Sequence, residues 1–126
     1  RVRLLQGADL VLAPYPDLDQ GAAGSLDYAM AAGRAIVATP FAYADEVLGD
    51  GSGVLVPPDA AAMSAAILDL LGDPQRRAEI GRRAHEATRA LTWTNVAGAY
   101  SRLFDRLGGQ RPIPSRARVS RLAAPA

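Results

Sequence analysis

The segment from Asp19 to Gly33, D-Q-G-A-A-G-S-L-D-Y-A-M-A-A-G, decides how the chain is organised. The apolar run Ala8 to Ala13 precedes it, and a turn containing Pro14, Tyr15 and Pro16 joins the two. This order predicts a strand, a glycine-bearing loop and then a helix. The first backbone N–H groups of a helix lack partners within it and carry the positive end of the helix dipole. An anion therefore suits this loop.

Glycine and serine in the loop fit that interpretation. Gly21 and Gly24 let the backbone approach a phosphate closely, and Ser25 can cap the helix or donate its hydroxyl. Two glycines before a helix are equally typical of an ordinary strand-to-helix turn in an α/β domain. The segments that follow Gly33 favour the anion site.

Composition bounds the class of protein. With 126 residues, of which 49% are hydrophobic, the chain buries one modest core and forms one domain or less. A net charge of +1 argues against a nucleic-acid-binding body, and no apolar run approaches the ~20 residues of a membrane span. The chain has no cysteine, so disulfides and thiolate metal sites are excluded. It begins with Arg1 rather than Met, which suggests a piece of a longer protein, and its basic residues are all arginine, as a high-GC bacterial genome produces.

Three apolar runs predict strands, at Asp9 to Ala13, Ala35 to Thr39 and Val54 to Val56. The first two are continuous apolar runs, which is typical of strands covered on both faces. Helical segments separate and follow the strands, so a parallel sheet with right-handed crossovers is expected. The expected helical segments are Ser25 to Ala32, Ala42 to Leu48, a helix capped by Asp59, Gln75 to about Ala90 after the cap Asp73-Pro74, and about Thr94 to Leu107.

Three blocks of sequence together resemble a known family. They are A-D-L-V-L-A-P at 8–14, A-M-A-A-G-R-A-I-V-A-T at 29–39 and A-D-E-V-L-G-D-G-S-G-V-L-V-P-P-D at 44–59. Their order and spacing, followed by a terminal helix pair, resemble the C-terminal domain of family 4 (group 1) retaining glycosyltransferases of the GT-B fold.

The resemblance implies a partial Rossmann-like three-layer α/β domain over residues 1–107, with three parallel strands and flanking helices. Residues 108–126 are expected to form a disordered basic tail. The strands would be the fourth, fifth and sixth of a sheet ordered 3-2-1-4-5-6, whose ligand crevice lies between strands one and four. The free edge of the first strand would then be a site for self-association.

The family signature is a pair of glutamates flanking a Gly-x-Gly loop. Aligning Met30 to Gly33 with the family block puts Gln20 and Tyr28 at the glutamate positions. A slip of one residue puts Asp19 and Asp27 there instead. The first register needs no gap, whereas the second keeps two carboxylates, and both stay open.

The resemblance also implies a role for each residue. Gln20 or Asp19 would lie near the donor sugar, in the catalytic position, and Tyr28 or Asp27 would bind the ribose. Glu46 matches the glutamate of the family's P-E pair at the donor pocket. The diphosphate would lie on the loop and the helix start, formed by Gly21, Ala22, Ala23, Gly24 and Ser25. A branch of the family has a similar Q-x-x-x-G loop with tyrosine in the helix, so the departure does not imply an inactive copy.

The implied activity is transfer of a sugar, with retention of configuration, from a nucleotide-diphosphate donor to an unidentified acceptor. The partners expected are the nucleotide-sugar, the acceptor and a missing N-terminal domain, with no metal cofactor and no nucleic acid. A cytoplasmic location is implied, either free or peripheral to the inner membrane, and the isolated chain is expected to be inactive. Two alternatives stay open, namely a non-catalytic degenerate domain used for binding or assembly and a fragment of a nucleotide-sugar 2-epimerase. His85 lies on a charged helix expected to be far from the loop, which argues against a catalytic base.

Overall fold

Three short parallel strands form the centre of the computed structural model, which describes residues 2–108. They are β1 (Leu10–Ala13), β2 (Ala35–Ala38) and β3 (Val54–Leu55), in the order β1-β2-β3. Leu10 pairs with Ala35 at the start of the sheet, and Ala38 pairs with Leu55 at its end. Within the described residues, the other edge of β1 has no strand beside it. The predicted parallel α/β arrangement is therefore confirmed.

Each strand is one residue shorter than the apolar run that predicted it. Single hydrogen bonds continue beyond the ladder, from Thr39 N–H to the Ala13 carbonyl at 3.2 Å and from Val56 N–H to the Ala38 carbonyl at 2.9 Å. Thr39 and Val56 therefore begin the loops at the carboxyl ends of their strands.

The helices include the five predicted segments, with bounds that differ by at most two residues, together with a first short helix and a 3-10 turn. They are α1 (Val2–Gln6), α2 (Gly24–Ala31), α3 (Ala42–Leu48), α4 (Ala60–Gly72), α5 (Pro74–Thr88), a 3-10 turn (Arg89–Leu91) and α6 (Trp93–Gly108). Two predicted caps are confirmed. Asp59 accepts the Ala62 N–H at 2.8 Å, and Asp73 accepts the Arg76 N–H at 2.9 Å, with Pro74 at the first position of α5.

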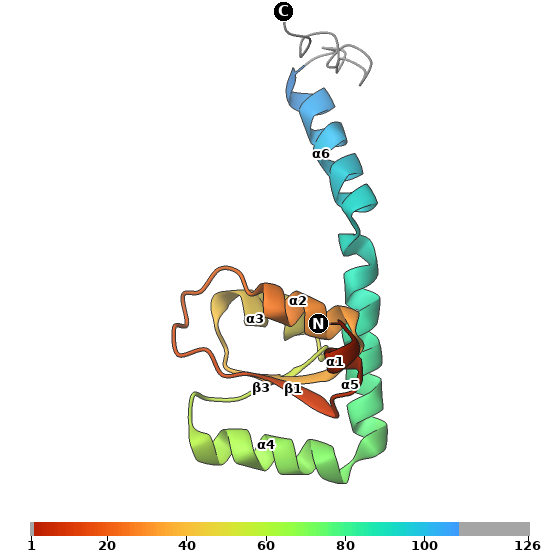
Figure 1. Cartoon of the computed structure of the whole chain (residues 1–126). Helices are drawn as coiled ribbons and strands as arrows, with labels where there is room; N and C mark the ends of the chain where they lie inside the picture. The colour runs from red at the N-terminus through yellow and green to blue at the C-terminus, as the bar shows by residue number, and fades with distance from the viewer. Residues whose placement is uncertain (1, 109–126) are drawn as a thin grey trace, which may run out of the picture. The chain divides into compact units, whose positions relative to one another are not determined.

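Helices cover both faces of the sheet, and β2 is buried along its whole length (Figure 1). Ile36 and Ala38 point into one core with α2 and α3, whereas Ala35 and Val37 point into a second core with α4. Successive strand residues alternate between faces, so one apolar strand supplies both cores. This is the predicted three-layer arrangement.

Helix α5 packs against the turn between α2 and β2 through two glycines. Gly33 ends α2 with a φ of 68°, a left-handed conformation that favours glycine. A Cβ added to Gly81 would lie 2.3 Å from the Gly33 carbonyl oxygen, so the two backbones approach as closely as glycine allows.

The chain forms two compact units, of which residues 2–92 and 93–108 are described. The second unit consists of α6, whose large apolar side chains recur at helical spacing: Val96, Tyr100, Leu103, Phe104 and Leu107. A single domain over residues 1–107 stays a prediction. Gly108 still belongs to α6, and the rest of the predicted basic tail, 109–126, lies outside the described residues. Among the described residues, no helix has the length and apolar character needed to cross a membrane.

Candidate functional site

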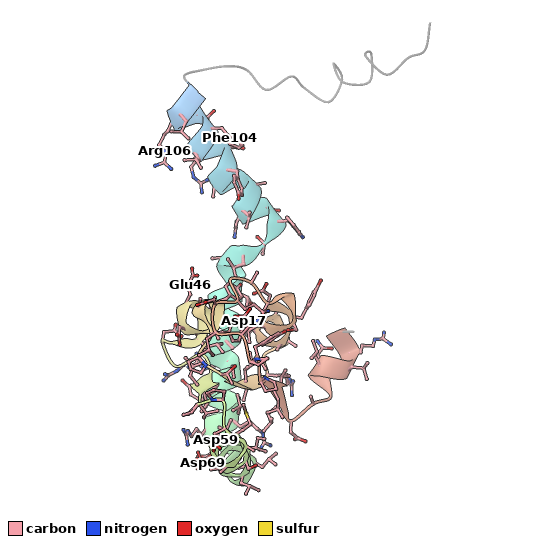
Figure 2. All side chains as sticks on the ribbon, turned by 90° about the vertical axis from the view of Figure 1, so that its left-hand side faces the viewer. Asp17, Glu46, Asp59, Asp69, Phe104 and Arg106 are labelled. Carbon is pink, nitrogen blue, oxygen red and sulfur yellow. The ribbon has the colours of Figure 1, made fainter. Side chains whose placement is uncertain are left out.

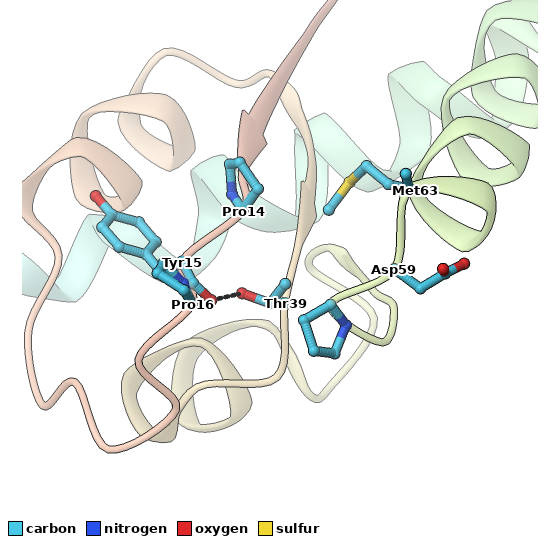
Figure 3. A pocket seen from close by; sticks show the side chains of 8 residues that line it. Pro14, Tyr15, Pro16, Thr39, Asp59 and Met63 are labelled. Atoms are coloured by element: carbon cyan, nitrogen blue, oxygen red, sulfur yellow. Dashed lines mark hydrogen bonds between the residues drawn. The ribbon is translucent and has the colours of Figure 1, made fainter.

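The loop between β1 and α2 lies at the carboxyl end of the sheet, where parallel α/β sheets bind ligands. Thr39, which follows β2, is buried, and its hydroxyl donates to the Tyr15 carbonyl oxygen at 2.7 Å (Figure 3). The Tyr15 ring meets the Phe41 ring edge-on, with centroids 4.9 Å apart. The start of the loop is therefore held by the end of the neighbouring strand.

The end of the loop is held by the N-terminus of α3. Ala42 N–H donates to the Leu18 carbonyl at 2.9 Å, and Tyr43 N–H donates to the Gln20 carbonyl at 3.4 Å. No side chain caps α3. The loop backbone thus takes the place of a capping side chain, which ties the position of Gln20 to that of α3.

Helix α2 begins one residue earlier than predicted, and Ser25 is not its cap. The N-cap residue is Ala23, and no side chain accepts a hydrogen bond from the first turn. The Ser25 hydroxyl instead lies 2.8 Å from the Tyr15 hydroxyl, within hydrogen-bonding distance. The interpretation of Ser25 as an N-cap is wrong for this reason, whereas the donor role of its exposed hydroxyl stays a prediction.

The predicted diphosphate loop presents mostly exposed backbone. Gly21, Ala22 and Gly24 are exposed, whereas the Ala23 side chain is buried in the core. A Cβ added to Gly21 or Gly24 would have no atom within 4 Å, and neither glycine has a positive φ. These glycines are therefore not required by the loop's own conformation or packing, and the surface above them is open.

The two candidates for the catalytic position have different surroundings. The Gln20 side chain is half-buried, and its amide donates to the Ala22 carbonyl at 2.8 Å. Asp19 is exposed, and its backbone N–H donates to the Asp17 carboxylate at 3.1 Å. Gln20 thus lies folded onto the loop that precedes α2, whereas the Asp19 side chain faces solvent.

Asp27 and Tyr28, the two candidates for ribose binding, point in different directions from α2. The Asp27 carboxylate accepts a hydrogen bond from the Tyr43 hydroxyl of α3. Tyr28 is 55% exposed and lines a hollow beside β1. Neighbouring residues on a helix are separated by about 100°, so one of them faces α3 and the other the hollow.

Burial and the contact with Asp27 make the Tyr43 phenol a weaker acid than an ordinary tyrosine. Burial, the hydrogen bond to Asp27 and the negative charges of Asp27 and Glu46 raise the pKa of Tyr43 to about 12. Glu46 itself lies on the exposed side of α3 (Figure 2). Its charge is the smallest of the causes that raise the pKa of Tyr43, and its role at the donor pocket stays a prediction.

Two hollows flank this region. The first, about 540 Å³, lies beside the free edge of β1 and is lined by Leu4, Leu5, Val11, Gly24, Ser25 and Tyr28. The second, about 280 Å³, lies at the carboxyl ends of the strands on the α4 side (Figure 3), lined by Pro14, Tyr15, Pro16, Thr39, Pro58, Asp59, Ala60 and Met63. Only the first contains residues of the predicted donor site.

Tyr15, Thr39 and Tyr43 shape the site but were not among the predicted site residues. Tyr15 stands between two prolines directly after a strand, which was the one available signal in the sequence. Thr39 and Tyr43 carry no such signal, since their partners are far away in the chain.

His85 lies at the other end of α2, where its imidazole Nδ1 is 2.9 Å from the Ala31 carbonyl oxygen. His85 therefore lies away from the loop, as expected. Within residues 2–108, no group of three or more His, Asp or Glu side chains has the arrangement of a metal site.

A three-layer parallel α/β unit with a glycine-bearing loop and an uncapped helix at its carboxyl edge defines the class of Rossmann-like ligand-binding domains. Residues 2–73 match the family model of glycosyl transferases group 1, and the chain belongs to this family. Over 83 residues it is 40% identical to a phosphatidyl-myo-inositol mannosyltransferase of Mycolicibacterium smegmatis, covering 64% of this chain and 22% of that protein. The structure is similar to sucrose-phosphate synthase from Thermosynechococcus elongatus, a GT-B protein, with a TM-score of 0.74, 26% identity, and coverage of 82% of this chain and 26% of the other. The chain therefore spans about a quarter of the length of these relatives.

Proposed function

We propose that this chain forms part of the donor-binding domain of a glycosyltransferase, which transfers a sugar from a nucleotide-diphosphate donor to an acceptor. One observation carries the proposal. The hollow beside the free edge of β1 brings together Gly24 and Ser25, at a helix start without a side-chain cap, and the exposed Tyr28. The diphosphate would accept hydrogen bonds from the first N–H groups of α2 and from the Ser25 hydroxyl.

The register with Gln20 and Tyr28 is the one we favour for the donor site. Tyr28 lines the hollow, whereas the Asp27 carboxylate already accepts a hydrogen bond from Tyr43. The Tyr28 hydroxyl would bind the ribose, and Gln20 would turn from the Ala22 carbonyl toward the donor sugar. Neutral groups contribute about 1 kcal/mol per hydrogen bond, against about 1.5–3 kcal/mol for a carboxylate, so donor binding would rely more on the diphosphate.

The rest of the catalytic machinery would come from the remainder of a longer protein. The relatives' greater length supports this, because the chain covers only 22% and 26% of them. A second domain would supply the acceptor site and the basic side chains that stabilise the leaving diphosphate. We expect retention of configuration, no metal cofactor, a cytoplasmic location and no sugar transfer by the 126-residue chain alone.

Nucleotide titration followed by amide proton–nitrogen NMR tests the donor site. Adding UDP or GDP to the chain should shift the amide peaks of Gly21 to Tyr28 and leave those of α4 and α5 unchanged. Tyr28→Phe should lower the affinity for the tighter-binding nucleotide by about 3- to 10-fold, which is the effect of one neutral hydrogen bond. Tyr100→Phe, a matched change on α6, should bind like the original chain.

The competing results are equally specific. A well-dispersed spectrum that neither nucleotide changes would refute the half-site and favour a degenerate, non-catalytic domain. If only the amide peaks of residues lining the second hollow shifted, such as those of Asp59, Ala60 and Met63, the nucleotide site would be assigned to the α4 side instead. Sugar transfer by the chain alone would refute its proposed dependence on a second domain.

A further inference from the structure

Tyr43 of α3 contacts the candidate donor segment, residues 20–28, near both of its ends. Its backbone N–H donates to the Gln20 carbonyl at 3.4 Å, at the beginning of that segment. Its hydroxyl donates to the Asp27 carboxylate, in the first turn of α2 and next to Tyr28. The two contacts lie on either side of the exposed Gly21–Ala22 backbone.

The helix that carries Tyr43 is anchored in the core, so Tyr43 is placed to hold those two ends. Its ring packs against the core that contains Phe41, Ala44 and Leu48. Phe41, Ala44 and Leu48 are completely or almost completely buried, so α3 is anchored through three positions. The preceding Ala42 N–H also donates to the Leu18 carbonyl at 2.9 Å. Tyr43 therefore connects an anchored helix to a loop whose own glycines pack against nothing.

The buried Ala23 side chain and the Gln20 amide, which donates to the Ala22 carbonyl, also restrain that loop, but its other residues have few contacts. Gly21 and Gly24 have open space where a side chain would be, and no side chain caps α2. The Tyr15 hydroxyl reaches Ser25, but this pair of groups is exposed to solvent. The hydrogen bond from Tyr43 to an ionised carboxylate is half-buried and charge-assisted, which makes it the stronger restraint on the first turn of α2.

We propose that Tyr43 is a positioning residue, which holds the Gln20 loop and the start of α2 at a fixed separation and thereby sets the spacing between Gln20 and Tyr28. The proposal rests on the proposed donor site, because that site gives the spacing its function. Tyr43 acts through Asp27 and does not itself contact the donor. Asp27 is accordingly a structural partner of Tyr43, with one carboxylate oxygen engaged on the α3 side.

Amide hydrogen exchange of the 126-residue chain tests the positioning role without any nucleotide. In Tyr43→Phe the ring stays in the core and only the hydroxyl is lost. The Leu26 amide, which donates to the Ala23 carbonyl at 2.8 Å in the first turn of α2, should then exchange at least about fivefold faster, while the amides of α4 and α5 stay unchanged. Asp27→Ala breaks the same contact from α2 and should have the same effect, so the test does not depend on one variant. The double variant should exchange no faster than either single one, since both remove one interaction.

Binding of UDP or GDP, whichever the chain prefers, tests the consequence. Tyr43→Phe should weaken binding by about 5- to 30-fold, and the loss should disappear in the Asp27→Ala background. Tyr100→Phe should match the original chain in both measurements. A merely structural role would lower the unfolding temperature and leave the nucleotide affinity unchanged.

Each outcome decides the proposal. Unchanged exchange of the Leu26 amide in Tyr43→Phe overturns it, as does faster exchange with unchanged nucleotide affinity. If neither nucleotide binds the original chain, the proposed donor site fails, and the exchange measurement alone decides whether Tyr43 positions the loop.

Discussion

Replacing Gly81 by alanine should destabilise the protein severely, although the same change in most helices is stabilising. In a helix interior, alanine is favoured over glycine by about 1 kcal/mol. At this position, however, the new Cβ would lie 2.3 Å from the Gly33 carbonyl oxygen and 3.0 Å from its carbonyl carbon. Both atoms belong to backbone, so no side-chain rotation relieves the overlap. Gly33 itself is held at a φ of 68° in the turn that begins β2.

The expected net cost combines these two effects. Overpacking costs typically 1–3 kcal/mol and more when backbone must move, so after the gain in helix propensity we expect a net loss of about 2 kcal/mol. For a unit of this size, that corresponds to a fall in the unfolding temperature of about 8–16 °C. Helix α5 must move away from β2, so Ile80 and Ala84 would lose burial in both cores.

Urea and thermal unfolding followed by circular dichroism measure this effect, with Gly72→Ala as the matched control. Gly72 is the last residue of α4, and a Cβ there would meet no atom within 4 Å. The control should therefore change the stability by less than about 1 kcal/mol, in the stabilising direction. If Gly81→Ala proved as stable as the original chain, the close approach of α5 to the α2–β2 turn would be refuted.

Two further predictions concern a titration and a core position. The phenol absorbance of the chain should contain one component near pH 12 that is missing from Tyr43→Phe, and Asp27→Asn should shift it to lower pH by removing a negative charge. Folding raises the pKa of Tyr43 from 10.0 to about 12, so the stabilisation that the protonated hydroxyl provides should be complete below pH 10 and lost as the pH rises through 12. If Tyr43→Phe and the original chain unfolded equally at alkaline pH, this prediction would be contradicted. Leu70→Ala should lower the free energy of unfolding in urea by about 2–5 kcal/mol, because Leu70 is fully buried. Leu71→Ala, at a position 46% exposed, should lower it by less than half as much. Equal losses would contradict the assigned face of α4.

Local chemistry made most of the fold predictable from the sequence. The run at 35–39 contains the buried strand β2, and Asp59 and Asp73-Pro74 cap the helices they precede. These signals work because strand burial, capping and the helix-ending conformation of Gly33 depend on residues close together in the chain. Helix α2 likewise buries Leu26, Ala29 and Met30, which share one face at helical spacing.

The cap of α2 was predicted less well, because the signal there was ambiguous. Serine is a common N-cap residue, but Ser25 lies inside the first turn, where its hydroxyl meets that of Tyr15. The proline-flanked Tyr15 reaches it only because Thr39 fixes the turn after β1. Whether Ser25 caps α2 or contacts Tyr15 therefore depends on how the two segments pack together.

The sequence by itself determined the order of strands and helices, the parallel sheet, the main caps and the resemblance to group 1 glycosyltransferases. Only the tertiary structure decided which of Asp27 and Tyr28 faces α3 and which faces the hollow beside β1. The alignment allowed both registers, since a shift of one residue costs little in sequence. On a helix the same shift turns a side chain by about 100°, and the position of α3 then determines which residue finds a partner and which stays exposed.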